Sequence, residues 1–205
     1  MNLKIDEIVM RSDKYAGFLS RLSDIYAFMD RKYKEAADYY GFNCMGCDDT
    51  CCRTLFYHHT VVEYLYLIEG YRNIDPAKQS EVSGRASRVC MKIEEIDGEK
   101  ITLRLLCPFN FDGLCVIYKY RPMICRLHGI PHELQKPGQA VFYGSGCKVF
   151  TDQNKKKDYF KFNRTPFYIE MAQLENELKQ YAGITCKFKM TIAEMVRSMK
   201  NRDGC

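Results

Sequence analysis

The chain has 205 residues, of which 46% are hydrophobic, and it carries a formal net charge of +5. A chain of this length can enclose one sizeable hydrophobic core, so we expect a single domain. A charge of this size does not indicate a nucleic-acid groove, and we do not expect nucleic acid as a partner. No segment approaches the roughly 20 consecutive apolar residues that cross a bilayer, so we expect no membrane association.

Cysteine is unusually frequent, with 11 residues in the chain. The N-terminal sequence MNLKIDEIVMRSDKYAGF contains no uninterrupted apolar run that could serve as a signal-peptide core, which predicts a cytoplasmic protein. An odd number of cysteines in a reducing compartment argues against a disulfide framework. Reduced thiols at short spacings are instead typical of metal ligands or catalytic groups.

The first predicted element is a long amphipathic helix over residues 13–41. Apolar and aromatic side chains recur at helical spacing from Tyr15 to Tyr40, and Gly41 gives a plausible stop. We expect this stripe to face the core. The alternative is a scaffold protein whose stripe stays exposed and binds a partner.

Two more helices are predicted after Cys52. Residues 60–71 form an apolar segment compatible with helix. Asp75 and Pro76 have the residue types of an N-cap and a first helical position, which predicts a second helix reaching about Ile96.

A short strand and a hairpin are predicted around the next cysteines. Residues 100–106 alternate apolar and polar side chains, which is the period of a strand, and they lead into Cys107. A turn at 112–113 separates this strand from an apolar run at 114–120. We expect the two runs to pair, which would hold Cys107 and Cys115 close together.

The remaining chain is expected to be irregular and then helical. Residues 126–146 contain several glycines and prolines, which predicts irregular backbone before Cys147. Helical spacing returns over 166–181, and Thr191 followed three residues later by Glu194 is the capping-box pattern of a final short helix.

These elements indicate a mostly helical α+β fold, in which helices surround a small, loop-rich cysteine core with a short β-hairpin. We divide the single domain 1–205 into three parts. These are an N-terminal helical extension at 1–41, a cysteine-cluster metal-binding region at 42–150 and C-terminal helices at 151–205.

The predicted metal ligands are the eight clustered cysteines. They are Cys44, Cys47, Cys51, Cys52, Cys107, Cys115, Cys125 and Cys147. Four of them fall within nine residues, and the two-residue spacing of the first pair lets both sulfurs reach one ion. Eight thiolates exceed the four that one tetrahedral zinc takes, so they indicate either two mononuclear sites or an iron–sulfur cluster plus a structural site. Thiolates suit zinc and iron alike, and the identity of the metal stays open.

Other residues are assigned less specific roles. We expect the isolated Cys90, Cys186 and Cys205 to act as small hydrophobic residues away from the cluster. Arg121 and Arg126 are expected near the thiolates as counter-charge or hydrogen-bond donors. His128, three residues after Cys125, is either a structural histidine or a substitute ligand.

The two cysteine segments resemble the YkgJ-like cysteine-cluster family of zinc- or iron-chelating domains, over about residues 42–150. The resemblance rests on Cys44-x-x-Cys47 with the doublet Cys51-Cys52, on Cys107-Pro108-Phe109, and on Cys115-x-Ile117-Tyr118-x-x-Arg121-Pro122-x-x-Cys125-Arg126. Three residues separate Cys47 from the doublet, where the family pattern has two. The resemblance implies a chelating domain. A similar cysteine block in flagellin lysine methylases is associated with iron–sulfur and methyl-donor chemistry.

Two functions follow from these patterns. The first is a metal-binding protein whose centre organises the fold and serves in redox chemistry or metal delivery. The alternative is an iron–sulfur-dependent enzyme, which predicts fewer than eight ligating cysteines and a pocket beside the centre lined by Tyr118, Arg121 and His128. The common hydrolase and nucleotide-binding motifs are missing from the sequence.

Overall fold

The computed structural model describes residues 12–43, 51–95, 104–154 and 157–200. Within these segments the chain forms seven α-helices, three short 3-10 helices and two small antiparallel sheets of two strands each. The predicted mostly helical α+β class is therefore confirmed.

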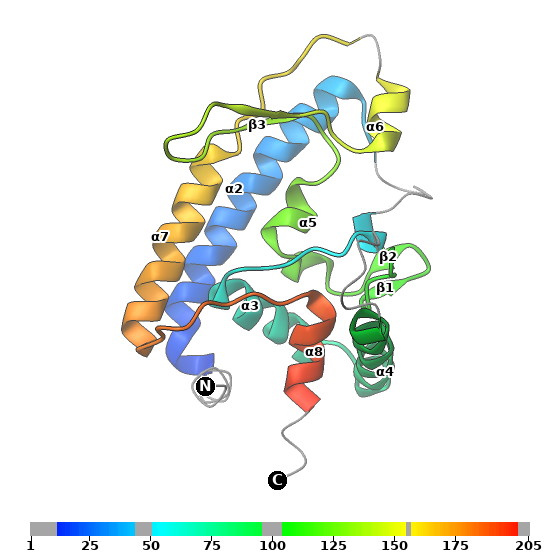
Figure 1. Ribbon diagram of the computed structural model, residues 1–205, viewed down its shortest axis with the longest axis vertical. Coiled ribbons are helices and arrows are strands. Elements are labelled where there is room, and N and C mark those ends of the chain that lie inside the picture. The colour runs from blue at the N-terminus through cyan, green and yellow to red at the C-terminus, as the bar shows by residue number, and fades with distance from the viewer. Residues whose placement is uncertain (1–11, 44–50, 96–103, 155–156, 201–205) are drawn as a thin grey trace.

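The elements follow one another along the chain as labelled in Figure 1. They are η1 (Ser12–Tyr15), α2 (Ala16–Tyr40), η2 (Cys51–Arg53), α3 (Val61–Arg72), α4 (Pro76–Glu95), β1 (Asn110–Phe111), β2 (Leu114–Cys115), η3 (Tyr118–Tyr120), α5 (Met123–Leu127), β3 (His132–Leu134), β4 (Phe142–Gly144), α6 (Lys148–Gln153), α7 (Thr165–Ala182) and α8 (Ile192–Lys200).

Helix α2 confirms the first prediction, including its end. Gly41 adopts a left-handed conformation with φ of 65°, and the Phe42 amide donates to the Ala37 carbonyl at 2.9 Å. This is the Schellman arrangement that commonly terminates helices at glycine. The apolar stripe is buried, at Leu19, Leu22, Tyr26, Met29, Ala36, Ala37 and Tyr40. The stripe thus belongs to the core, and the exposed stripe that the scaffold alternative predicts is not found on α2.

Three helices form the frame of the molecule. Helices α2 and α7 run side by side in opposite directions (Figure 1), and both pack against α3. Helix α3 has buried side chains around most of its circumference, from Val61 to Gly70. A helix that is apolar all round is stable only in the interior, so α3 lies at the centre of this frame.

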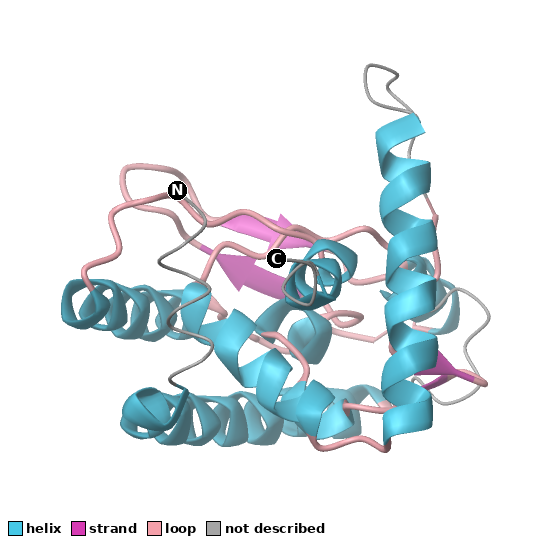
Figure 2. Ribbon diagram, turned by 90° about the horizontal axis from the view of Figure 1, so that it is seen from below, coloured by secondary structure: helices cyan, strands magenta, loops and turns pink. Residues whose placement is uncertain are grey.

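A second layer is made by α4 and α8, which pack against each other. Figure 2 shows α4 lengthwise, so it crosses the direction of α2 and α7. The predicted caps are present. The Asp75 carboxylate accepts from the Lys78 amide at 2.9 Å, and Thr191 and Glu194 exchange the two capping-box hydrogen bonds at 2.7 and 3.2 Å.

A hairpin forms at the predicted turn, but its first strand is at 110–111 and not in the predicted segment 100–106. Residues 104–106 are not in a strand, and 100–103 lie outside the described residues. Pairing is confined to β1 and β2, which flank the turn at 112–113 directly. Both turn residues have positive φ, which is the backbone of a tight two-residue hairpin turn. A strand over 100–106 is therefore wrong where the structure describes it.

A second hairpin replaces part of the predicted irregular segment. Strands β3 and β4 pair antiparallel, with Glu133 opposite Tyr143. Their connection contains Pro137 and Gly138, and the Gln139 amide donates to the Lys136 carbonyl at 3.1 Å. Pairing here depends on backbone hydrogen bonds, because the strand side chains stay half-buried or exposed.

Buried side chains from all three predicted parts of the chain join one core cluster. The division of the chain into three parts stays a prediction. Within the described residues, no helix is both long enough and apolar enough to span a membrane.

Candidate metal centre

A cavity of about 800 Å³ opens between α2, η2, the β1–β2 hairpin, α5 and the start of α8. Six of the eight predicted ligands line it, namely Cys51, Cys52, Cys107, Cys115, Cys125 and Cys147. The other two, Cys44 and Cys47, lie outside the described residues. Every predicted ligand that the structure describes therefore reaches the same cavity.

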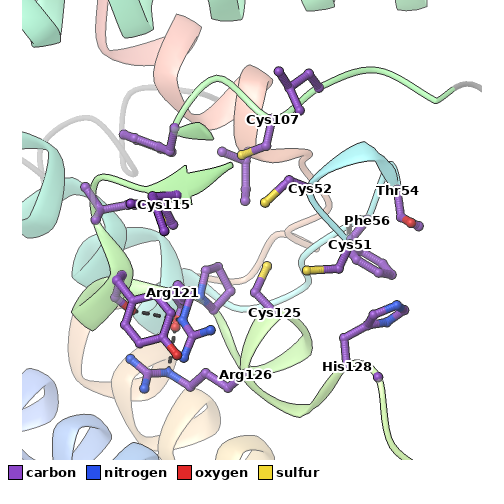
Figure 3. A pocket seen from close by; sticks show the side chains of 18 of the residues that line it. Cys51, Cys52, Thr54, Phe56, Cys107, Cys115, Arg121, Cys125, Arg126 and His128 are labelled. Atoms are coloured by element: carbon purple, nitrogen blue, oxygen red, sulfur yellow. Dashed lines mark hydrogen bonds between the residues drawn. The ribbon is translucent and has the colours of Figure 1, made fainter. Parts of the chain in front are cut away.

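The side chains converge from separate elements. Figure 3 shows Cys51 and Cys52 entering from η2, Cys107 from the segment before β1, and Cys125 from α5. Their sulfur atoms point toward the middle of the cavity, and Cys115 lies across from them at the end of β2. The Cys107 amide donates to the Cys52 carbonyl at 2.7 Å, which joins the two cysteine segments through their backbones.

The hairpin and α5 set the positions of three of these cysteines. The Asn110 amide donates to the Cys107 carbonyl at 3.0 Å, and Asn110 pairs with Cys115 across the hairpin. Pro122 then serves as N-cap of α5, with an extended backbone, which places Cys125 in the first turn of that helix. The sequence motif from Cys107 to Cys125 thus folds as a hairpin followed by one short α-helix.

Cys52, Cys107, Cys115 and Cys125 form what we term the four-cysteine set. Burial is the largest cause that raises the pKa of Cys107, Cys115 and Cys125, and it brings that of Cys115 to about 11. Charges of other thiolates in the set raise these pKa values further, with Cys52 acting on all three. The four sulfurs are thus close enough to repel one another as anions, and a cation between them would remove that repulsion.

The donor chemistry fits a thiolate-bound metal. Four thiols facing one cavity are the ligand type of structural zinc and of iron–sulfur clusters. Within the described residues, however, no three His, Cys, Asp or Glu side chains already form a group that could hold a metal ion. The described thiols would therefore have to draw closer together around a metal.

Both predicted arginines lie beside the sulfurs and line the cavity. The Arg121 guanidinium lowers the pKa of Cys115 and Cys125, and Arg126 lowers that of Cys115, in each case by less than burial raises it. Arg121 stacks on the Tyr118 ring, with Cζ 3.5 Å from the ring centroid. Their expected position near the sulfurs is confirmed, and their role as counter-charge to a metal centre stays a prediction.

Two histidines also line the cavity. His128 packs against Phe56, with ring centroids 5.5 Å apart (Figure 3), and burial followed by the Arg164 charge lowers its pKa. His58 is buried, its backbone pairs with Met190, and burial lowers its pKa as well. Both rings are therefore neutral at pH 7, the form in which histidine can bind a metal.

Cys147 has a local structural role as well. It is the N-cap of α6, and its sulfur accepts from the Phe150 amide at 3.4 Å. Of the predicted outliers, Cys90 is buried in α4 and Cys186 is half-buried, and neither lines the cavity. Cys205 lies outside the described residues.

Glu63 is a buried residue near the centre to which no sequence pattern assigns a role. It lies on α3 with 5% of its surface exposed, and its carboxylate accepts from the first amide of α5, that of Met123, at 2.7 Å. One signal could have found it, because Glu63 is the only charged side chain between Thr60 and Ile68. A charge in such a run is buried only when it has partners.

Comparison with known proteins identifies no relative, because neither a family model, nor a curated protein, nor a solved structure matches the chain. The resemblance to the YkgJ-like family therefore stays a prediction from the cysteine motifs.

Proposed function

We propose that the protein binds zinc or an iron–sulfur cluster through the four-cysteine set. One observation carries the proposal: four thiols from three separate segments line one cavity (Figure 3). Buried cysteines that serve only as small hydrophobic residues have no reason to gather in this way.

A metal at this place would organise the fold. The set joins η2, the hairpin and α5, which are three short elements far apart in the sequence. A structural zinc supplies about 10 to 16 kcal/mol of apparent folding free energy, compared with a net stability of about 5 to 15 kcal/mol for a typical domain. The other predicted ligands, Cys44, Cys47, Cys51 and Cys147, are enough for a second centre of the YkgJ-like type.

An enzyme is the second candidate, and the cavity favours it. Tyr118, Arg121 and His128 all line the cavity, as this alternative predicted. Its volume of about 800 Å³ lies within the range of small-molecule sites, about 300 to 1,000 Å³, and exceeds what a metal ion needs. Under this proposal an iron–sulfur cluster would supply redox or methyl-transfer chemistry, and Arg121 would orient an anionic group of the substrate.

Metal analysis and an absorption spectrum of anaerobically purified protein test the proposal. Cys125→Ser should lose metal and lower the thermal midpoint, because serine is a poor ligand for a soft-thiolate site. Cys186→Ser is the matched control, since that half-buried cysteine does not line the cavity, and it should keep both. Equal metal content in the two variants would show that Cys125 is not a ligand.

The spectrum also separates the two candidates. A colourless protein that contains zinc would support the metal-binding function and exclude the iron–sulfur enzyme. Visible absorption together with bound iron would be compatible with the enzyme. The iron-loaded protein would then be titrated with S-adenosylmethionine as a methyl donor. If the protein binds this donor and Arg121→Gln weakens the binding, the result supports an enzyme. The lack of any binding would count against methyl transfer.

We propose a cytoplasmic location for the protein, because thiolates stay reduced in that compartment.

A further inference from the structure

We infer that a buried network of Tyr26, Glu63 and Arg126 positions Cys125 in the candidate metal centre. The inference rests on the proposed function. The network joins Tyr26 and Glu63, which lie outside the cysteine motifs, to Arg126, which ends one motif and lines the cavity.

Glu63 is the centre of the network. Its Oε1 accepts from the Tyr26 hydroxyl at 2.9 Å and from the Met123 amide at 2.7 Å, and its Oε2 accepts from the Thr60 hydroxyl at 2.6 Å. Three donors satisfy a carboxylate that is almost fully buried. A carboxylate in this setting stays ordered because each lost hydrogen bond would leave a buried polar group unpaired.

The hydrogen bond to Met123 fixes the start of α5. The N-cap of that helix is Pro122, which makes no side-chain cap hydrogen bond. Glu63 supplies the missing acceptor from another helix, α3. Since Cys125 follows Met123 by two residues, this contact determines where its sulfur enters the cavity.

Arg126 anchors the other side of Cys125. Its guanidinium lies over the Tyr26 ring at 4.1 Å, pairs with Asp30 on α2 at 2.6 Å, and donates to the Arg121 carbonyl at 2.8 Å and to the Lys119 carbonyl. Tyr26 therefore touches Glu63 through its hydroxyl and Arg126 through its ring face. Cys125 lies between two residues, Met123 and Arg126, that are tied to the frame of α2 and α3.

Packing alone would not require such a network. Burying a carboxylate and a guanidinium costs free energy that apolar side chains would avoid. We therefore infer that the two charged groups serve to fix one arrangement of α5 against α2 and α3. Groups that hold metal ligands through hydrogen bonds typically change metal affinity about 10- to 100-fold when they are replaced. We expect an effect of this size from Glu63.

The chain offers a matched control in Glu175. This residue is also 5% exposed, and its carboxylate accepts from the Val62 amide at 3.1 Å at the start of α3. Both glutamates thus cap a helix from a neighbouring helix. Only Glu63 caps the helix that carries a cysteine of the four-cysteine set.

Four variants of the full chain are compared by titration with cobalt(II), whose thiolate spectrum reports on the site. Glu63→Leu removes the acceptor at similar volume. Glu63→Gln keeps all three hydrogen bonds, with its oxygen accepting from Tyr26 and Met123 and its amide donating to Thr60. Glu175→Leu is the control. Tyr26→Phe removes a single hydroxyl and remains useful if Glu63→Leu fails to fold, which circular dichroism would show.

We expect cobalt affinity about 10- to 100-fold weaker in Glu63→Leu and several-fold weaker in Tyr26→Phe. Glu63→Gln should bind within about threefold of the wild type, and Glu175→Leu should keep its affinity although its thermal midpoint falls. Unchanged affinity in Glu63→Leu and Tyr26→Phe, or an equal loss in Glu175→Leu, would overturn the inference alone. A wild-type chain that binds no cobalt would overturn the proposed function as well.

Discussion

Arg126 and Asp30 form one ion pair whose two ends differ greatly in burial. The arginine side chain is 4% exposed and the aspartate side chain is 46% exposed. Replacing either residue breaks the same pair. Arg126→Ala and Asp30→Asn therefore separate the contribution of the ion pair from that of the other contacts that Arg126 makes.

The expected effects are unequal. Arg126→Ala leaves the carbonyls of Lys119 and Arg121 without their donor, at about 1 to 3 kcal/mol each when buried, and loses the stacking on Tyr26, worth up to about 2 kcal/mol. We expect a total of about 3 to 5 kcal/mol. Asp30→Asn should cost about 1 kcal/mol or less, because ion pairs that reach solvent contribute little.

Thermal and urea unfolding of both variants, compared at equal metal content, measure this difference. For a chain of this size about 1 kcal/mol corresponds to about 2 to 4 °C, so Arg126→Ala should melt roughly 10 °C lower than the wild type. If the two variants lie within about 1 kcal/mol of each other, the carbonyl hydrogen bonds and the stacking do not carry the stability assigned to them.

Two further predictions concern residues away from the centre. Gly70→Ala should cost about 1 to 3 kcal/mol, because the added Cβ would lie 2.5 Å from the Tyr120 side chain, whereas Gly17→Ala has open space and should stabilise α2 by up to about 1 kcal/mol. Thermal midpoints of the two glycine variants should shift in opposite directions, down for Gly70→Ala and up for Gly17→Ala. Burial lowers the pKa of His132 to about 4, so the imidazole of His132 binds a proton more tightly in the unfolded chain than in the folded one. Stability should fall as the pH drops from about 6.5 toward 4, and urea midpoints of His132→Asn should depend less on pH across that window.

Local signals were sufficient to predict the five longest helices, α2, α3, α4, α7 and α8, whereas the short α5 and α6 were not predicted. Gly41 stops α2 because its own backbone conformation closes the helix end, and Asp75 caps α4 within three residues of itself. The exchange between Thr191 and Glu194 is equally local. Such features depend on neighbours in sequence, so they can be found without knowledge of the tertiary structure.

The strands were predicted less well because pairing depends on partners elsewhere. Alternation over 100–106 is weak evidence in a short segment, and the tight turn at 112–113 pairs only the residues that flank it. Strands β3 and β4 show no alternation of buried and exposed positions. Their only local signal was Pro137-Gly138, a dipeptide that suits a turn.

The cysteines that line the cavity could be predicted from the sequence, but the buried residues that hold them in position could not. Short spacings of one residue type at Cys115 and Cys125 carry chemical meaning in the sequence itself. Glu63 instead meets Tyr26 and Met123 across separations of 37 and 60 residues, and Arg126 meets Asp30 across 96. Contacts at such distances follow from the packing of α2, α3 and α5, which no local pattern encodes.

The hydrogen bond between the Cys107 amide and the Cys52 carbonyl bears on the rate of unfolding. It closes a loop that contains α3 and α4, and the entropy of such a closure must be lost before all four thiols can meet. A metal would then bind the complete set only after this loop has closed. Interactions formed late in folding act mainly on the unfolding rate. The metal should therefore prolong the lifetime of the native state far more than it accelerates its formation.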